Sequence, residues 1–236
     1  MESFQSVIDT LNQQSNKEHY CSNADFIPRP GLIFEAFKLV KSPKQVRIVI
    51  LGQDPYPRKQ SAAGISFLDL QSSTLADKKQ SISMRNIIKA ILQHNRLFFN
   101  TMNDVRDLIE SQFAIKQTKS YFTALAEDCG ILFLNASLTH EDKASVNKHI
   151  KFWEPVIAEA FKSICMESPG VVFLLMGEFA KSYEKYIILG ENVRVVKSCH
   201  PMMFRFLEEN TFEQIKEAEQ SLNQGVTDFI KCKIIK

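Results

Sequence analysis

The chain has 236 residues, enough to bury one sizeable hydrophobic core, so we expect a single domain over 1–236. Hydrophobic residues make up 44% and charged residues 24% of the sequence, a composition that argues against a disordered chain. The net charge of +2 supplies no general attraction to nucleic acids, so any phosphate-binding surface has to be local.

The cysteines and the chain start exclude further classes of protein. Five cysteines are scattered without a C-x-x-C pair, which argues against a disulfide framework and a zinc site and favours free thiols in a reducing compartment. The N-terminus lacks the pattern of a signal peptide, and no apolar run reaches the roughly 18 residues that cross a bilayer. We therefore expect no membrane association.

The first 30 residues predict an N-terminal helix and a loop. Apolar residues recur at helical spacing up to about Asn23, which indicates one polar amphipathic helix. Pro28 and Pro30 then indicate a loop, and a short helix is expected from Ile33 to Leu39.

Strand and helix patterns alternate through the rest of the chain. Four short apolar runs rich in β-branched residues predict buried strands, at residues 46–51, 130–134, 171–176 and 193–196. Helical spacing predicts five helices, at residues 84–94, 121–128, 153–167, 178–186 and 211–224, the last of which closes the chain. This alternation predicts an α/β fold of one domain, with a central parallel four-stranded sheet flanked by helices.

Polar side chains follow three of the predicted strands at the point where each strand ends. Asp54 follows the first strand, Asn135 the second and His200 the last. Open α/β sheets bind ligands outside the carboxyl ends of their strands, so these side chains predict a site there. Taken singly, Asp54 before Pro55 and Asn135 at a strand end are also ordinary turn residues.

Several motifs, in the same order along about residues 46–230, resemble those of the uracil-DNA glycosylases of the Ung type. The segment Gly52-Gln53-Asp54-Pro55-Tyr56, with Phe67 downstream, resembles the water-activating motif of that family. The segment Leu134-Asn135-Ala136-Ser137-Leu138-Thr139 is similar to its uracil-binding segment. Gly177 resembles the glycine before a DNA-contacting loop, and His200-Pro201 the start of the HPSPLS motif.

The resemblance implies a monofunctional uracil-DNA glycosylase that flips deoxyuridine out of DNA, hydrolyses its N-glycosidic bond and initiates base-excision repair. Asp54 would orient or deprotonate the water and stabilise the cationic sugar, and His200 would hydrogen-bond the departing uracil anion. Asn135 would read the Watson–Crick edge of uracil, because its amide offers both a donor and an acceptor. The resemblance implies no metal and no cofactor.

The resemblance also assigns further substrate-binding and DNA-binding residues. Gln53 would bind uracil, Phe67 would stack on its ring, and Tyr56 would stand at C5 and exclude the methyl group of thymine. The implied DNA-binding residues are Ser83, Lys78, Lys79, Gly177, Pro201, Phe204 and Arg205. Phe204 takes the place of the residue that enters the base stack.

The expected partners follow from the same resemblance. They are uracil-containing DNA, single- or double-stranded, and a proteinaceous glycosylase inhibitor or a replication protein. We expect a monomer in the cytoplasm, associated with the nucleoid, or in the nucleus or cytoplasm of a host if the protein is viral.

Four departures from the family pattern mark this sequence. The histidine that usually follows the tyrosine is Pro57, and the proline-rich loop is replaced by residues 78–83. Glu178 follows the glycine of the second DNA loop, and the HPSPLS motif continues as Met202-Met203-Phe204-Arg205. These loops leave open a DNA- or replication-protein-binding module with weak or altered excision, or a related glycosylase with another base preference.

The four remaining histidines have no metal-ligand spacing, and we expect them on the surface or in helices: His19, His94, His140 and His149. The family often carries a histidine near its substrate loop, after the uracil-binding asparagine. The alignment there is off by a residue, so neither His140 nor His149 is assigned a role.

Overall fold

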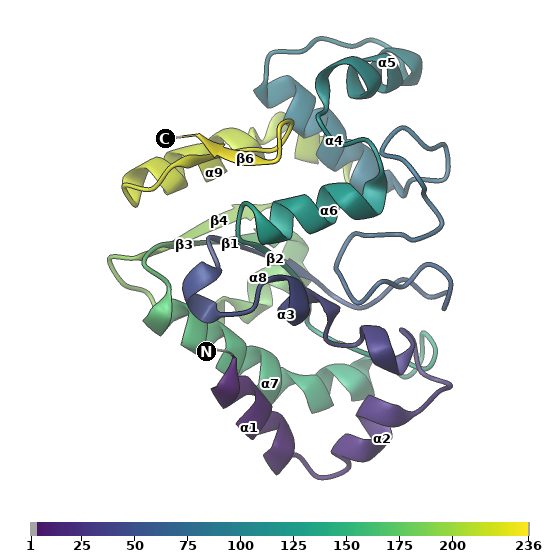
Figure 1. The fold of residues 1–236 in the computed structure, drawn as a ribbon, viewed down its shortest axis with the longest axis vertical. Helices are drawn as coiled ribbons and strands as arrows, with labels where there is room; N and C mark the ends of the chain where they lie inside the picture. Colours follow the sequence, from purple (N-terminus) through teal and green to yellow (C-terminus); the bar gives the residue numbers. More distant parts are fainter. Residues whose placement is uncertain (1–3, 236) are drawn as a thin grey trace.

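A parallel four-stranded sheet lies at the centre of the molecule, as the alternation of elements predicts (Figure 1). The computed structural model describes residues 4–235; the ends of the predicted domain, residues 1–3 and 236, lie outside the described residues. The strand order is β2-β1-β3-β4. The strands are β1 (Ile48–Gly52), β2 (Ile131–Asn135), β3 (Val171–Met176) and β4 (Val193–Ser198).

Helices cover both faces of this sheet, so each face has its own apolar core. One core is shared by α4 (Ile82–His94), α5 (Met102–Gln112), α6 (Thr118–Glu127) and α9 (Thr211–Ser221). The other is shared by α1 (Gln5–Gln13), α2 (Lys17–Ser22), α3 (Glu35–Leu39), α7 (Val146–Glu167) and α8 (Gly177–Lys181). In Figure 1, α4 and α9 lie above the sheet and α1 and α7 below it. The inner strands are therefore apolar on both sides, which explains their continuous apolar runs.

The N-terminal segment forms two helices, α1 and α2, rather than the single helix predicted. Asn16, between them, adopts a left-handed backbone conformation with φ of 65°, which interrupts the helix. The expected loop follows and contains the 3-10 turn η1 (Pro30–Leu32). A second 3-10 turn, η2 (Pro43–Gln45), leads into β1.

Helix α5 is present although the apolar spacing does not predict it. It is a polar helix with two buried side chains, Val105 and Ile109, so its hydrophobic pattern is weak. A capping box starts it. The Thr101 Oγ1 accepts from the Asp104 N–H at 3.2 Å, and the Asp104 carboxylate accepts from the Thr101 N–H at 2.8 Å.

Two later helices differ from their predicted bounds. Helix α7 begins at Val146 rather than at Trp153, because Val146 and His149 are buried on the same face as Trp153. The helix predicted over 178–186 is α8 followed by a 3-10 turn, η3 (Ser182–Tyr186). Within the described residues, no helix has both the length and the apolar character needed to cross a membrane.

The chain does not close with α9. After it comes an antiparallel hairpin of β5 (Val226–Asp228) and β6 (Lys233–Ile235). The buried Glu219 carboxylate of α9 accepts from the N–H and hydroxyl of Thr227, at 2.9 and 2.7 Å, and lies 2.9 Å from Arg47 Nη2. This contact joins the hairpin to the segment that enters β1.

Candidate active site

A pocket of about 360 Å³ opens at the carboxyl ends of the strands. Its walls include Asp54 from the loop after β1, Asn135 at the end of β2, and His200 from the loop after β4. The structure thus brings together the acid, the amide and the imidazole that the strand ends predict. The volume falls in the range of about 300–1,000 Å³ that is usual for small-molecule sites.

The other predicted substrate-binding residues line the same pocket: Gln53, Tyr56 and Phe67. Among the predicted DNA-binding residues, Ser83 does so as well. The rest lie outside the pocket lining and are described below.

Asp54 is half-buried in this pocket. Desolvation by burial raises the pKa of its carboxyl group, and the nearby His140 opposes the rise. The backbone on either side of Asp54 is fixed. The Ser137 N–H donates to the Gln53 carbonyl at 2.8 Å, and His140 Nε2 lies 3.1 Å from the Pro55 carbonyl oxygen. The acid is therefore presented by a loop tied to the end of β2.

Asn135 is buried, and Gly52 makes room for its amide. The two residues are register partners in the parallel pair of β1 and β2. A Cβ at Gly52 would lie 2.5 Å from Asn135 Oδ1 and 2.8 Å from the Ser66 Cβ, closer than real contacts allow. The glycine of the motif therefore sets the position of the Asn135 amide.

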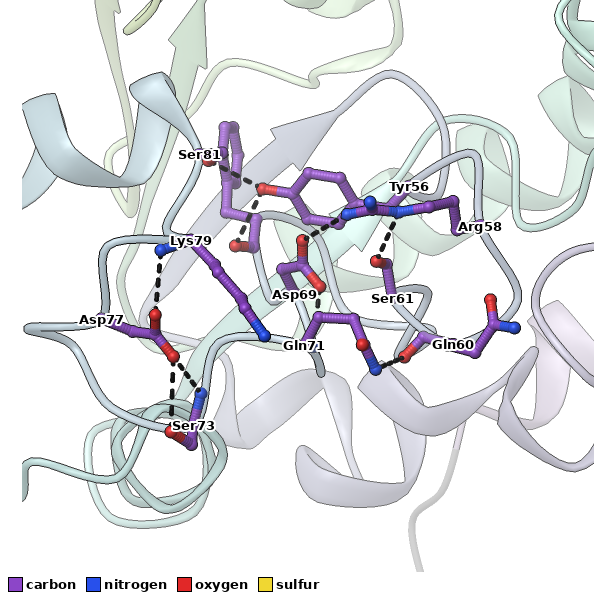
Figure 2. A network of polar contacts seen from close by, with 11 residues as sticks. Tyr56, Arg58, Gln60, Ser61, Asp69, Gln71, Ser73, Asp77, Lys79 and Ser81 are labelled. Atoms are coloured by element: carbon purple, nitrogen blue, oxygen red, sulfur yellow. Dashed lines mark hydrogen bonds and ion pairs between the residues drawn. The ribbon is translucent and has the colours of Figure 1, made fainter.

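Tyr56 is held at the pocket wall by its hydroxyl group. The hydroxyl donates to Ser81 Oγ at 2.9 Å and, more weakly, to the Phe67 carbonyl at 3.4 Å (Figure 2). Burial raises the pKa of the phenol, which keeps this donor protonated. Ser81 also caps α4, because its Oγ accepts from the Met84 N–H at 3.1 Å. The same serine thus joins the tyrosine to the start of α4.

Phe67 reaches the pocket through an unusual backbone conformation. Its φ is 65°, in the left-handed region that residues with a side chain seldom adopt. Such strain persists where the surrounding structure imposes it, and it is frequent at functional sites.

His200 is a neutral imidazole with its hydrogen on Nε2. The Met202 N–H donates to His200 Nδ1 at 3.1 Å, so Nδ1 is the accepting nitrogen. Much of the residue stays open to solvent, yet partial desolvation of the ring lowers the pKa of His200. Gly177 lies directly behind it, where a Cβ would stand 3.0 Å from the His200 Cβ. The DNA contact predicted for Gly177 stays a prediction; the structure gives this glycine the role of making room for His200.

The predicted phosphate-binding residues Ser83, Lys78 and Lys79 lie in α4 and in the loop before it. Ser83 is buried in the first turn of α4. Lys78 and Lys79 are exposed in the preceding loop, where the Asp77 carboxylate accepts from the Lys79 N–H at 2.9 Å (Figure 2). Both lysines are free to meet a phosphate, although an acid sits beside them.

The loop after His200 presents an apolar tip to solvent. Met202, Met203 and Phe204 are 60%, 58% and 74% exposed, and Phe204 starts the 3-10 turn η4 (Phe204–Glu208). Pro201 is buried, and its carbonyl accepts from Asn86 Nδ2 of α4 at 2.7 Å. Arg205 is exposed, with its Nε 3.4 Å from Glu209 Oε1. The tip is therefore anchored at its base and open at its end.

The expectation that the remaining histidines lie on the surface or in helices holds for His19, His94 and His149, which lie in helices, and is wrong for His140. His149 is in α7 but is 1% exposed; its Nδ1 lies 2.9 Å from Thr139 Oγ1, and burial lowers its pKa to about 4. His140 is also 1% exposed, because its backbone pairs with that of Ile27. The helical spacing of His149 with the apolar Val146 and Trp153 could have revealed that His149 is buried. No local sequence pattern reveals the burial of His140.

The sequence assigns no role to several other residues that line the pocket: Ser66, Ser81, Ile82, Met176, Phe179 and Met202. They come from several segments of the chain and are brought together by the fold. Within residues 4–235, no group of three or more His, Cys, Asp or Glu side chains is arranged to hold a metal ion. The five cysteines, all in the described part of the chain, are free.

Comparison with known proteins gives the same family throughout. The sequence model of the Uracil DNA glycosylase superfamily matches residues 40–223. The chain is 31% identical over 219 residues to the uracil-DNA glycosylase of Borrelia turicatae, covering 90% of this chain and 86% of that protein. It is 34% identical over 189 residues to the uracil-DNA glycosylase of Lactobacillus helveticus, covering 80% of this chain and 69% of that protein.

Solved structures share the fold. The wild-type UNG of Nitratifractor salsuginis matches with a TM-score of 0.70 at 22% identity, over 92% of this chain and 95% of that one. The uracil-DNA glycosylase of mimivirus matches with a TM-score of 0.70 at 18% identity, over 97% of this chain and 86% of that one. With the superfamily model covering most of its length, the chain belongs to the uracil-DNA glycosylase superfamily.

Proposed function

We propose that this chain is a monofunctional uracil-DNA glycosylase that hydrolyses the N-glycosidic bond of deoxyuridine in DNA. The observation that carries the proposal is one pocket, at the carboxyl ends of the strands, lined by Asp54, Asn135 and His200. A base within a duplex cannot reach such a pocket, so the nucleotide is flipped out of the stack first. Release of uracil leaves an abasic site and initiates base-excision repair.

Asp54 and His200 suit the positive charge on the sugar and the negative charge on uracil that develop during the reaction. As the glycosidic bond breaks, the sugar gains oxocarbenium character and the departing uracil gains negative charge. The Asp54 carboxylate is placed to activate water and to stabilise the cationic sugar. The neutral His200 has its Nε2–H available for the uracil anion, because Nδ1 already accepts from Met202.

Selectivity for uracil is attributed to the amide and the tyrosine. Asn135 offers a donor to O4 and an acceptor to N3–H of uracil, whereas cytosine presents the opposite pattern. A mismatched buried pair costs on the order of 1–3 kcal/mol for each unsatisfied group. Tyr56, fixed by Ser81, supports exclusion of the 5-methyl group of thymine.

DNA is the expected macromolecular partner. Exposed Lys78 and Lys79 in the loop before α4 support contacts with phosphates, and the exposed Phe204 supports insertion into the base stack. A mimivirus UNG variant has been solved in complex with UGI, which supports a proteinaceous inhibitor as a second partner of this chain. The monomeric state, a replication partner and the cellular location stay predictions.

The test is incubation with a uracil-containing oligonucleotide followed by alkali, which cleaves the strand at each abasic site. We expect cleavage with the wild type and none with Asp54→Asn or Asn135→Ala, while oligonucleotides carrying thymine or cytosine stay intact. Asp107→Asn, an exposed acid on α5 away from the pocket, is the matched control and retains full activity. Tight DNA binding without cleavage by the wild type would instead establish a binding module.

A further inference from the structure

His140 lies directly behind the loop that carries Asp54. It is 1% exposed, and its Nε2 is 3.1 Å from the carbonyl oxygen of Pro55. A carbonyl oxygen only accepts, so Nε2 carries the hydrogen and donates it. The other ring nitrogen, Nδ1, is buried and has no hydrogen-bond partner among residues 4–235.

The segment after β2 holds the backbone on both sides of Asp54. The Ser137 N–H donates to the carbonyl of Gln53, the residue before Asp54, at 2.8 Å. The His140 side chain donates to the carbonyl of Pro55, the residue after it. A backbone hydrogen bond thus holds the residue before Asp54, and the His140 imidazole holds the residue after it. We call this pair of contacts the clamp.

The clamp is fixed at its base. The His140 N–H donates to the Ile27 carbonyl at 2.9 Å, and the Ile27 N–H donates to the His140 carbonyl at 2.8 Å. The imidazole thus sits at a set position between the N-terminal segment and the loop that follows β1. A small displacement of this loop would move Asp54 relative to the sugar.

Packing alone does not explain a histidine at this position. A buried ring nitrogen without a partner lowers stability, and an apolar side chain of similar size would fill the space without that cost. His140 reaches this loop from a different segment of the chain, the one that follows β2.

The pKa values of Asp54, Asp142 and His149 each depend in part on the nearby His140. Burial raises the pKa of Asp54, and His140 opposes that rise. Hydrogen bonds from Ser145 lower the pKa of Asp142, with a smaller contribution from His140, while burial and then His140 lower the pKa of His149.

We propose that His140 is a positioning residue for uracil excision, which holds the Asp54 loop in place through its hydrogen bond to the Pro55 carbonyl. It also opposes the rise that burial causes in the pKa of Asp54. This inference rests on the proposed function, in which Asp54 acts as the carboxylate. His140 does not line the pocket, so its effect appears in the excision rate rather than in substrate affinity.

Two variants separate the hydrogen bond from the imidazole. His140→Leu removes both, and we expect its single-turnover excision rate to fall about 10-fold to 100-fold with an unchanged KM, the effect of a misplaced catalytic group. His140→Gln keeps an N–H donor for the Pro55 carbonyl, and we expect a smaller loss of excision rate.

Excision requires ionised Asp54, so excision is lost as pH falls through the pKa of that group. Without the imidazole this pKa rises, and the acid limb of the rate profile moves to higher pH in both variants.

A readout that does not need excision completes the test. The Asp54 carboxyl carbon is titrated by NMR in the wild type, in His140→Gln and in a control, His94→Gln. His94 lies at the C-terminal end of α4, whereas residues at the start of α4 line the pocket. We expect the Asp54 pKa to rise in His140→Gln and to stay unchanged in His94→Gln.

An unchanged Asp54 titration in His140→Gln, or wild-type excision by His140→Leu, overturns the inference. If His140→Leu does not fold, the titration of His140→Gln decides. If the wild type does not release uracil, the proposed function is wrong. The NMR titration then still tests the effect of His140 on Asp54.

Discussion

Asp54 and His200 reach the pocket from different strands, and partial burial moves their pKa values in opposite directions. The pKa of Asp54 is raised and that of His200 is lowered, because the charged form of each is disfavoured there. Asp54 is therefore ionised only above its raised pKa, and His200 stays neutral until the pH falls below its lowered pKa. Under the proposed function, ionised Asp54 faces the sugar and neutral His200 faces uracil.

Tyr56 is the residue to which we attribute discrimination against thymine. A hydrophobic slot distinguishes one methyl group by about 1–3 kcal/mol, but a rigid ring at C5 excludes it sterically. We expect Tyr56→Ala to excise thymine as well as uracil, measured as alkali-labile sites in oligonucleotides that carry either base. Tyr56→Phe is the matched control, because it keeps the ring and loses the bond to Ser81. Strict uracil selectivity in Tyr56→Ala would reject the steric assignment.

Gly52 sets the position of the Asn135 amide. A methyl group there collides with Asn135 Oδ1, so we expect Gly52→Ala to lower the excision rate about 10-fold or more, as expected for a displaced binding group. Gly31→Ala is the matched control, because a Cβ at Gly31 meets no atom within 4 Å. Steady-state kinetics on a uracil-containing single strand provide the comparison. Equal rates for the two variants would contradict the assignment.

The sequence predicts the strand-end residues of the site but not those that support them. Asp54, Asn135 and His200 follow apolar strands, and parallel strands carry their carboxyl ends to one edge, so their meeting follows from local pattern. The contact of His140 with Pro55 and that of Ser81 with Tyr56 join segments distant along the chain. No local spacing encodes such contacts, which depend on the packing of the whole fold.

At the scale of elements, the loop from His200 to η4 is the part that departs most from the family pattern. Its base is held by the bond between Asn86 and the Pro201 carbonyl, while Phe204 points its ring into solvent. An anchored apolar tip at the mouth of a base pocket suits a wedge between base steps.

If Phe204 acts as a wedge, its replacement affects uracil excision from duplex DNA more than from single strands. A single strand has no stack to open, so we expect Phe204→Ala to slow uracil excision from duplex DNA more than from a single strand of the same sequence. The measurement is the ratio of the two rates. Phe98→Ala, which removes a 92% exposed phenylalanine beyond the far end of α4, leaves the ratio unchanged. Equal slowing on both substrates by Phe204→Ala would exclude the wedge.

Elements with a strong apolar period are predicted well, and polar ones are not. All four strands are confirmed, because burial on both faces imposes continuous apolar runs. Helix α5 is missed because it buries little, although its Thr101-x-x-Asp104 capping box was a usable signal. The break at Asn16 depends on one left-handed residue, and the hairpin after α9 depends on contacts with Glu219.

At the scale of the whole molecule, one buried carboxylate joins the C-terminal hairpin to the entrance of the central strand. Glu219 has no exposed side-chain surface and contacts both Arg47 and Thr227. Removing one partner of such a buried pair leaves the other charge unpaired, a loss of about 3–5 kcal/mol. We expect Glu219→Ala to lower the free energy of unfolding by that amount in urea denaturation.

A second glutamate on the same helix provides the control. The Glu213 side chain is 44% exposed, and its contact with Lys216 is a surface pair worth about 0–1 kcal/mol. Glu213→Ala is therefore expected to leave the urea midpoint almost unchanged. A similar loss of unfolding free energy in both variants would show that the buried contact of Glu219 with Arg47 contributes no more to stability than the surface pair.

The most direct test of the proposed function compares catalysis with binding in Asp54→Asn. Single-turnover release of uracil is measured on a uracil-containing single strand, and affinity is measured on the same strand. We expect the rate to fall at least about 100-fold, the scale of a lost acid–base group, with DNA affinity retained. Release of uracil by Asp54→Asn at the wild-type rate would contradict the assignment of Asp54 as the catalytic carboxylate.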